Sequence, residues 1–442
     1  MVQDLTKGKL TPLLIRFTIP LILGNLLQLT YNAIDSIIVG RFVGSKALAA
    51  VGTANPITTL IILLLNGITL GAGVLIGNLY GAQDYKRLER QISTAMIAGS
   101  LFTIVVSILG FIFAKDLLLL LQVKSSVLHL ATGYLRIILA GLIFTFTYNY
   151  FASTLRALGD SQSPLYFLAA SAIFNIIGDL FFVIVLKQGV HGAAISTVIS
   201  EGLSVLLCLV YIKKKVPILD LKKKWLVFDS KMLKKTIAYG SVTALQQSTV
   251  QMGKLGIQTI VNTMGVPEMA AFNVVNRPDD FAIIPEQNIA HAMTAVMAQN
   301  KGAGETKRIE AAFHIGLRIE FVYGIFSGLI FLFLANPIMK IFTTDAKVIA
   351  LGETYLHLIA FMYILPGITN GLQGYFRGTG DLKITFFSSL LNMVMRVISC
   401  ALFTFYFKLG FRSVPWSYLV GWIFMILFEL PYLISYRKKH KA

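Results

Sequence analysis

The chain has 442 residues, of which 56% are hydrophobic and only 14% are charged, and its mean hydropathy is +0.73. Soluble globular chains carry roughly 25% charged residues, so this composition excludes an ordinary soluble domain and indicates a membrane protein. The net charge of +18 does not indicate a nucleic-acid partner, because the basic residues lie in loops between apolar segments.

Twelve apolar segments follow one another along the chain. Each is long enough to cross a bilayer as a helix, since about 20 residues span the hydrocarbon core. Their length and the lack of a two-residue period exclude membrane strands. We therefore predict an all-α, polytopic membrane protein with twelve transmembrane helices in two pseudo-symmetric six-helix lobes. The predicted spans are 14–40, 47–78, 91–113, 128–155, 163–187, 189–213, 235–263, 270–299, 309–335, 349–376, 384–408 and 413–436.

The first span carries one acid, Asp35, within "YNAIDSIIVG". A carboxylate at membrane depth is costly, so it usually faces a cavity or a partner. Span five carries Asn175 and Asp179, four residues apart and thus on one helical face, and span six carries Thr197. At a rise of roughly 1.5 Å per residue, Asp35, Asp179 and Thr197 fall at similar depths in the outer half of the bilayer. We predict that these four residues form one site.

The predicted site offers carboxylates, a hydroxyl and an amide. These groups suit a hard cation such as Na⁺, or a proton shared between like-charged carboxylates. We predict that Asp35, Asn175, Asp179 and Thr197 couple transport to H⁺ or Na⁺, that they are the metal ligands if the ion is Na⁺, and that no other cofactor is needed. The alternative is that each aspartate only bonds to a neighbouring helix.

Three tyrosines are candidates for the wall of a substrate cavity. Tyr31 lies one turn before Asp35, and Tyr134 and Tyr148 lie in span four. A tyrosine ring attracts an organic cation through its π face. Packing or a lipid-facing position is the alternative for each of them.

The second half of the sequence repeats the first at an offset of 221 residues. "YGAQDYKRLE" at 80–89 matches "KGAGETKRIE" at 301–310, and "RALGD" at 156–160 matches "RGTGD" at 377–381. Six spans per half make the halves parallel repeats, as in secondary transporters, with a central cavity expected between two lobes. A duplication that only enlarges a bundle is the alternative. The predicted domains are an N-terminal lobe (1–213), a cytoplasmic linker loop (214–234) and a C-terminal lobe (235–442).

Basic residues are concentrated in alternate loops, most densely in the loop around 213–235. The positive-inside rule therefore places both termini in the cytoplasm. A polybasic anion-binding patch is the alternative for that loop. We expect a multi-pass protein of the cytoplasmic membrane that acts as a monomer, with small-molecule substrates and lipids, and no nucleic acid, as partners.

The second half does not repeat the predicted ion site. At the same offset, the equivalents of Asp35, Asn175, Asp179 and Thr197 are Gly256, Arg396, Cys400 and Tyr418. Coupling is therefore predicted to reside in the first half.

Span eight is unusually polar and carries Asp279, Asp280 and Glu286. These acids either attract a cationic substrate in the cavity or pair internally within the second lobe, since a buried acid needs one or the other. Pro278 and Pro285 predict a kinked or broken helix in this span. The basic side chains available for internal pairing form a predicted charge cluster of Lys254, Arg277 and Arg396.

The stretches "YNAIDSIIVGRFVG", "LRALGDSQSP" and "FNIIGD", together with the twelve-span repeat, resemble the multidrug and toxic compound extrusion (MATE) family. The similarity is closest to the prokaryotic branch that includes the DNA-damage-inducible type. It implies an antiporter that exports organic, often cationic or amphipathic, drugs against inward Na⁺ or H⁺ by alternating access. It also implies that the predicted ion site is the cation or proton site of the first lobe.

Two other functions compete with drug export. A flippase for lipids or lipid-linked oligosaccharides on a related scaffold remains the alternative, because of the basic side chains of the second half. A membrane-embedded enzyme would need a nucleophile or a metal cluster, and no such spacing stands out. The sequence also lacks the G-x-x-x-x-G-K-[ST] phosphate loop, so ATP is not the energy source within this chain. We therefore predict a transporter and not an enzyme.

Overall fold

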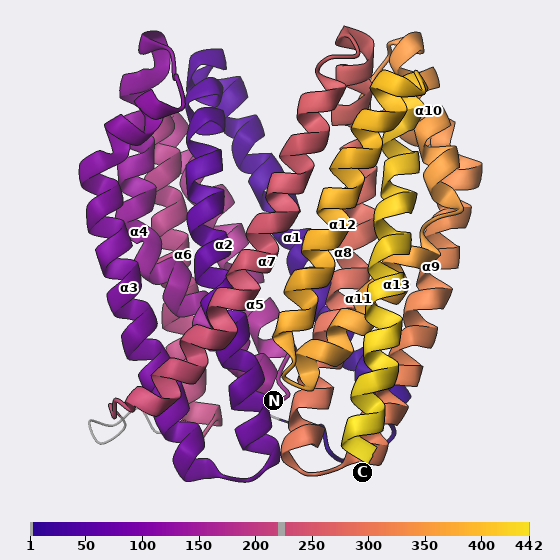
Figure 1. The fold of residues 1–442 in the computed structure, drawn as a ribbon. Helices are drawn as coiled ribbons and strands as arrows, with labels where there is room; N and C mark the ends of the chain where they lie inside the picture. The colour runs from indigo at the N-terminus through magenta and orange to yellow at the C-terminus, as the bar shows by residue number, and fades with distance from the viewer. Residues whose placement is uncertain (1–2, 220–225, 442) are drawn as a thin grey trace. The chain divides into compact units, whose positions relative to one another are not determined.

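The computed structural model describes residues 3–219 and 226–441, and every regular element within these ranges is helical (Figure 1). The middle of the predicted linker, residues 220–225, lies outside the described residues. Short π-helical segments, η1 (Val39–Val43), η2 (Leu180–Val185) and η4 (Leu402–Tyr406), extend three of the helices, and a 3-10 turn, η5 (Gly410–Arg412), precedes the last. The α-helices are α1 (Leu10–Ile38), α2 (Ser45–Gly81), α3 (Tyr85–Leu120), α4 (Ser125–Ala157), α5 (Gln162–Asp179), α6 (Gly189–Lys215), α7 (Ser230–Val261), α8 (Val266–Gly302), α9 (Thr306–Phe342), α10 (Ala346–Ala360), α11 (Ile364–Gly378), α12 (Leu382–Ala401) and α13 (Ser413–Lys441).

The helices match the twelve predicted spans in chain order. Within the described ranges, nine helical segments are long and apolar enough to cross a membrane, and the bent pair α10–α11 makes a tenth. The two remaining long helices, α7 and α8, have 32 and 37 residues. Both contain several charged and amide side chains, which lower their hydropathy. The predicted all-α, twelve-helix architecture is confirmed.

The break in the helical pattern lies in span ten, not in span eight. Helices α10 and α11 meet at an angle of 55° between Ala360 and Ile364. Pro366 causes this, because proline cannot donate to the carbonyl four residues earlier, that of Met362, and its ring clashes with it. Helix α8 continues through Pro278 and Pro285, so it is not broken there, and a kink at these prolines stays a prediction. Membrane helices tolerate proline where neighbouring helices satisfy the freed backbone groups.

Contacts divide the described residues into two units. Unit 1 comprises Met1–Lys7, Ile19–Ala244 and Gly302–Gly304, and unit 2 comprises Gly8–Thr18, Leu245–Lys301 and Glu305–Ala442. Helix α7 therefore belongs to unit 1 up to Ala244 and to unit 2 from Leu245 on. The domain boundaries proposed from the sequence, at 213 and 235, stay a prediction.

The sequence repeat is visible in the backbone. Residues with positive φ occur in pairs 221 positions apart, as in Lys187 at 52° and Lys408 at 53°. The π-helical segments η2 and η4 occupy equivalent positions, at the ends of the fifth and eleventh spans. A side-chain contact repeats too, because Tyr211 donates to Asp160 at 2.6 Å and Tyr432 donates to Asp381. The other pairs with positive φ are Gly44 and Gly265, Gln83 and Gly304, Gly159 and Gly380, and Gly189 and Gly410.

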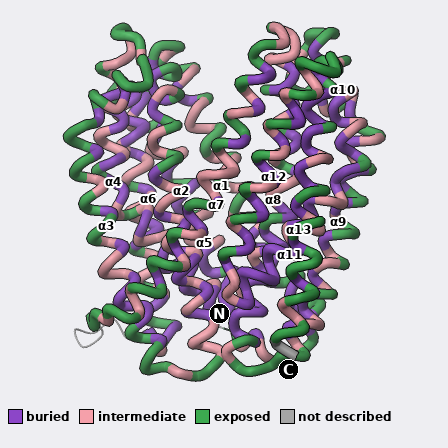
Figure 2. Tube along the Cα trace, viewed as in Figure 1, coloured by how far each residue is buried: buried purple, intermediate pink, exposed green. Residues whose placement is uncertain are grey.

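Each unit has its own apolar core and an apolar outer surface. In both units, buried positions alternate along the helices with exposed ones (Figure 2). The core of unit 1 includes Phe146, Tyr150 and Phe151 of α4, all fully buried. Large apolar side chains also cover the exposed face of α3, among them Leu101 at 63% exposure. An exposed apolar face of this length is suited to lipid and not to water.

Helices α2 and α7 pack closely through glycines within unit 1. A Cβ atom on Gly71 would lie 2.6 Å from the backbone nitrogen of Gly240, and one on Gly67 would lie 2.6 Å from Cβ of Ala244. Small residues four apart on both helices let the two backbones approach, the usual way to pack helices where lipid offers no hydrophobic drive.

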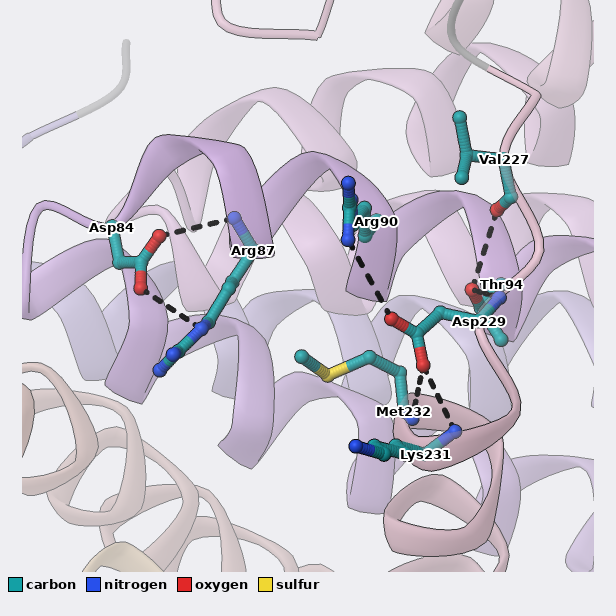
Figure 3. A network of polar contacts seen from close by, with 8 residues as sticks. All are labelled: Asp84, Arg87, Arg90, Thr94, Val227, Asp229, Lys231 and Met232. Carbon is teal, nitrogen blue, oxygen red and sulfur yellow. Dashed lines mark hydrogen bonds and ion pairs between the residues drawn. The ribbon is translucent and has the colours of Figure 1, made fainter.

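The last part of the predicted linker, around Val227 and Asp229, is hydrogen-bonded to α3 (Figure 3). Thr94 Oγ1 donates to the carbonyl of Val227 at 3.3 Å and accepts from the amide of Asp229 at 3.0 Å. Asp229 then caps α7 by accepting from the amides of Lys231 and Met232 at 2.9 and 3.2 Å. Such a cap satisfies amides that the first turn leaves without partners. The start of α7 is thus part of unit 1.

Candidate functional site

Two aspartates from different helices face each other inside unit 1. Asp35 lies in α1 and Asp179 is the last residue of α5, and their carboxyl groups lie within hydrogen-bonding range of each other. Asp179 is fully buried. Within the described part of the chain, no donor meets both the distance and the angle of a hydrogen bond to either of its carboxyl oxygens. Two adjacent carboxylates in a low dielectric repel strongly, so this pair needs a proton or a cation between its charges.

The polar partners come from the contact of α5 with α6. Asn175 donates its amide to Ser196 Oγ at 3.3 Å and to Thr197 Oγ1 at 3.5 Å, and Ser196 donates to the carbonyl of Asn175 at 2.9 Å. Gly178 permits this approach, because a Cβ there would lie 2.5 Å from Ser196 Oγ. The structure thus brings together all four residues of the predicted ion site.

Two residues of this site were not foreseen from the sequence. Ser196 lies beside the Asp179 carboxyl, and Glu201, one turn after Thr197 on α6, accepts a hydrogen bond from Thr145 of α4 at 2.5 Å. Glu201 could have been found, because it is an acid inside the predicted sixth span at a spacing of four from Thr197. Ser196 gave no signal, since a small hydroxyl is common in membrane helices.

The three candidate tyrosines lie in different surroundings. Tyr134 is 8% exposed and lies within electrostatic range of Asp35, Asp179 and Glu201. Tyr31 is near Asp35 and Glu201. Tyr148 instead donates its hydroxyl to the carbonyl of Pro164 at 2.9 Å, which joins α4 to the start of α5. The structure therefore places Tyr31 and Tyr134 near the acids of the ion site, and Tyr148 at the contact of α4 with the start of α5.

The three candidate acids of unit 2 lie on α8 in different surroundings. Asp279 is buried and accepts a hydrogen bond from Tyr363. Asp280 forms a partly exposed ion pair with Lys254 at 3.4 Å. Glu286 is fully buried and lies about two turns after Asp279, on nearly the same face of α8. Asp280 is thus the one of the three with substantial exposure.

Two members of the predicted charge cluster, Lys254 and Arg396, both lie in electrostatic range of Asp279. Arg396 is 8% exposed and its guanidinium stacks on Tyr418 at 3.7 Å and on Trp422 at 4.8 Å, with Asp279 in electrostatic range. Lys254 is held by its ion pair with Asp280, and Arg277 is exposed. Among the described residues, no contact joins these three basic side chains. The stacking of Arg396 fills the place that Asn175 occupies in the first half.

The donor set of the ion site fits a proton or a small hard cation. Within residues 3–219 and 226–441, no group of three or more histidine, cysteine, aspartate or glutamate side chains is arranged to hold a metal ion. A Na⁺ ion would therefore depend on Asn175 and on hydroxyl oxygens besides the two aspartates. Oxygen ligands of this kind suit hard monovalent cations and not transition metals.

The chain matches a known family and known folds. A family model described as MatE matches residues 20–181 and 243–402, well over half of the chain. The chain belongs to the MatE family. The two matched stretches fall one in each half, as the sequence repeat requires, and the family resemblance seen in the sequence is confirmed. Assignment to the DNA-damage-inducible branch stays a prediction.

Relatives and solved structures of MatE-like proteins cover nearly the whole chain. The chain is 29% identical to the probable multidrug resistance protein YpnP of Bacillus subtilis (strain 168), across 91% of this chain and 90% of that protein. It is also 29% identical to the probable multidrug resistance protein YoeA of the same organism, across 82% and 80%. A crystal structure described as MATE in complex with MaD3S has the same fold, with a TM-score of 0.93 and 22% identity over 99% of both chains. This MatE-family chain is thus a multi-pass membrane transporter and not an enzyme, as predicted.

Proposed function

We propose that this MatE-family protein is a cation-coupled antiporter. It exports organic, cationic or amphipathic, drugs and toxic compounds across the cytoplasmic membrane by alternating access, in exchange for inward H⁺ or Na⁺. Relatives named as multidrug resistance and multidrug export proteins support the class of substrate. No cofactor is needed besides the coupling ion.

The observation that carries the proposal is the pairing of Asp35 with the fully buried Asp179. When both are ionised, their repulsion favours a loosened contact between α1 and α5, and an incoming proton or Na⁺ removes it. Binding the coupling ion therefore changes how α1 packs on α5 and α6. Tyr31 and Tyr134 lie at the same acids, so the charge there also sets the attraction for an organic cation.

The orientation follows from the distribution of basic residues. We propose that both termini lie in the cytoplasm, because the loops on their side carry the greater number of lysines and arginines. Lipids surround the exposed apolar faces, and we propose a monomer with no nucleic-acid partner.

The test is transport by the purified protein in proteoliposomes, with a pH gradient and a Na⁺ gradient imposed in turn and a fluorescent organic cation as substrate. Asp35→Asn and Asp179→Asn are expected to abolish the response to whichever gradient drives the wild type. Asp116→Asn, an exposed aspartate at the far end of α3, is the matched control.

If neither the pH gradient nor the Na⁺ gradient drives transport by the wild-type protein, the antiport proposal is refuted. Movement of fluorescent lipids without any gradient response would favour the flippase alternative. Normal coupling in Asp35→Asn, at equal protein levels, would remove that residue from the mechanism.

A further inference from the structure

Unit 2 buries four acids that the proposed ion site does not use. Asp279 is 6% exposed, and Glu286, Glu320 and Glu429 are fully buried. They lie on α8, α9 and α13, near the middle of long helices. None repeats an acid of the first half, because the equivalents of the three glutamates are Leu65, Gly99 and Cys208. These acids therefore arose separately from the site around Asp35.

The buried bases of unit 2 cannot neutralise all of these acids. Arg396 lies in electrostatic range of Asp279, whose carboxylate also accepts the Tyr363 hydroxyl. Arg377, 7% exposed, serves both Glu320 and Glu429. Four acids thus share two arginines, and Lys254, which is also in range of Asp279, is already paired with Asp280. Two negative charges are therefore in excess if every group is ionised. Uncompensated charges in a membrane interior cost several kcal/mol, so they are neutralised in practice.

Glu286 of α8 and Glu320 of α9 act on each other electrostatically, and Arg377, the base in range of Glu320, is shared with Glu429. All four carboxyl oxygens of Glu286 and Glu320 are buried. Among the described residues, no donor lies at both the distance and the angle of a hydrogen bond to any of them. The amide of Asn370 lies beside Glu286, and it is a neutral group. Buried oxygens of this kind are costly unless a proton or a ligand satisfies them.

Helix packing closes the surroundings of the pair. A Cβ on Gly367 of α11 would lie 3.1 Å from the carbonyl oxygen of Glu320, so α9 and α11 approach without side chains between them. The other titratable groups that face the pair are, from α8, Asp279, from α9, Tyr323, and from α11, Arg377, together with Tyr363 just before it.

We propose that Glu286 and Glu320 form a second proton-binding site, in which the two carboxyl groups hold at least one exchangeable proton between them. A proton suits the pair better than a metal ion, since no group of three acidic or histidine ligands exists among the described residues. This goes beyond the proposed function, which places coupling in the first half. A transporter with this pair binds its coupling ion in the first half and a proton in the second, at positions that the repeat does not relate.

The test is infrared difference spectroscopy of the purified wild-type protein at neutral pH without Na⁺, substrate or gradient. A protonated carboxylic acid has a C=O absorption that a carboxylate lacks, and the band shifts in D₂O. The wild-type spectrum minus that of the Glu286→Gln/Glu320→Gln double variant is expected to show this band. The same subtraction with Glu353→Gln is expected to lack it. Glu353 is a partly exposed glutamate of unit 2 that accepts a hydrogen bond from Asn336.

Absence of the band from the double-variant difference would overturn the proposal, because both glutamates would then be ionised. Loss of the wild-type band on addition of Na⁺ would also overturn it and assign the pair to a metal ion. If the double variant does not fold, the two single variants are measured instead. If neither single variant loses the C=O band, the proposal is likewise overturned. The spectrum requires no transport, so failure of the antiport proposal and failure of this one are distinguished.

Discussion

Replacing Gly71 with alanine is expected to weaken the contact between α2 and α7. The new Cβ would lie 2.6 Å from the backbone nitrogen of Gly240 and 2.8 Å from the carbonyl carbon of Tyr239. Both are backbone atoms and cannot rotate away, so one helix must retreat by about 0.8 Å to restore ordinary contact at 3.4 Å. Overpacking of this kind costs about 1–3 kcal/mol.

The helix itself gains from the substitution, which sets the net magnitude. Alanine favours a helix over glycine by about 0.8–1 kcal/mol. Gly71→Ala is therefore expected to lower the free energy of unfolding by up to about 2 kcal/mol. Gly52→Ala, in the same helix, meets nothing within 4 Å and is expected to leave stability unchanged or to raise it. The two variants differ by the same single methyl group, so the sign of the effect isolates the contact.

The measurement is unfolding of each variant in detergent, followed by circular dichroism as denaturing detergent is added. The midpoint is expected to fall for Gly71→Ala and to stay or rise for Gly52→Ala. Equal midpoints for both variants would refute the close crossing of α2 and α7. A fall of equal size in both would show that the helix tolerates no alanine, for reasons unrelated to α7.

Three further predictions concern single side chains. Burial raises the pKa of the Asp160 carboxyl, but hydrogen bonds from Tyr211 and Ser163 outweigh burial and hold the pKa below its usual value. Tyr211→Phe should therefore lower the free energy of unfolding by about 1.5–3 kcal/mol at pH 7. This loss should be present above about pH 4 and should disappear as the pH falls through the lowered pKa, which melting curves across that range would show. Arg396→Lys keeps the charge but loses the planar stack on Tyr418 and Trp422, and should lower stability by about 0.5–2 kcal/mol in denaturant titrations, whereas Arg412→Lys, at an exposed site, should not. Glu201→Gln keeps the shape of the site and removes a charge near Tyr31 and Tyr134, so gradient-driven efflux should fall, but less than in Asp179→Asn; an unchanged rate would place Glu201 outside the site.

Hydropathy and spacing predicted much of the fold and part of the site. The twelve spans followed from apolar length, because a bilayer sets the same minimum for every helix. The site around Asp35 followed from the spacing of Asn175 and Asp179 and from equal depths along three helices. The spacing within one helix and the distance of a residue from a helix end can both be read from the sequence alone.

Contacts between helices that are distant in sequence could not be predicted. Thr145 and Glu201 lie 56 positions apart, and only the packing of α4 on α6 joins them. For the expected cluster of Lys254, Arg277 and Arg396, the sequence did not show that Arg396 stacks on two rings or that Arg277 is exposed, because a pattern of charges does not say which groups lie opposite each one. The break after Ala360 was also missed, since Pro278 and Pro285 gave the same signal as Pro366 without the same outcome.

The two halves share their left-handed turns, such as those at Lys187 and Lys408, although their buried side chains differ. Turn geometry leaves few residue choices, while a position inside a helix accepts an acid, an arginine or a cysteine without rebuilding the chain. An ancestral duplication could thus redistribute its ionic chemistry between copies by single substitutions. Engineering can follow the same route, by grafting an acid from one copy onto the equivalent helix of the other while every turn is left as it is.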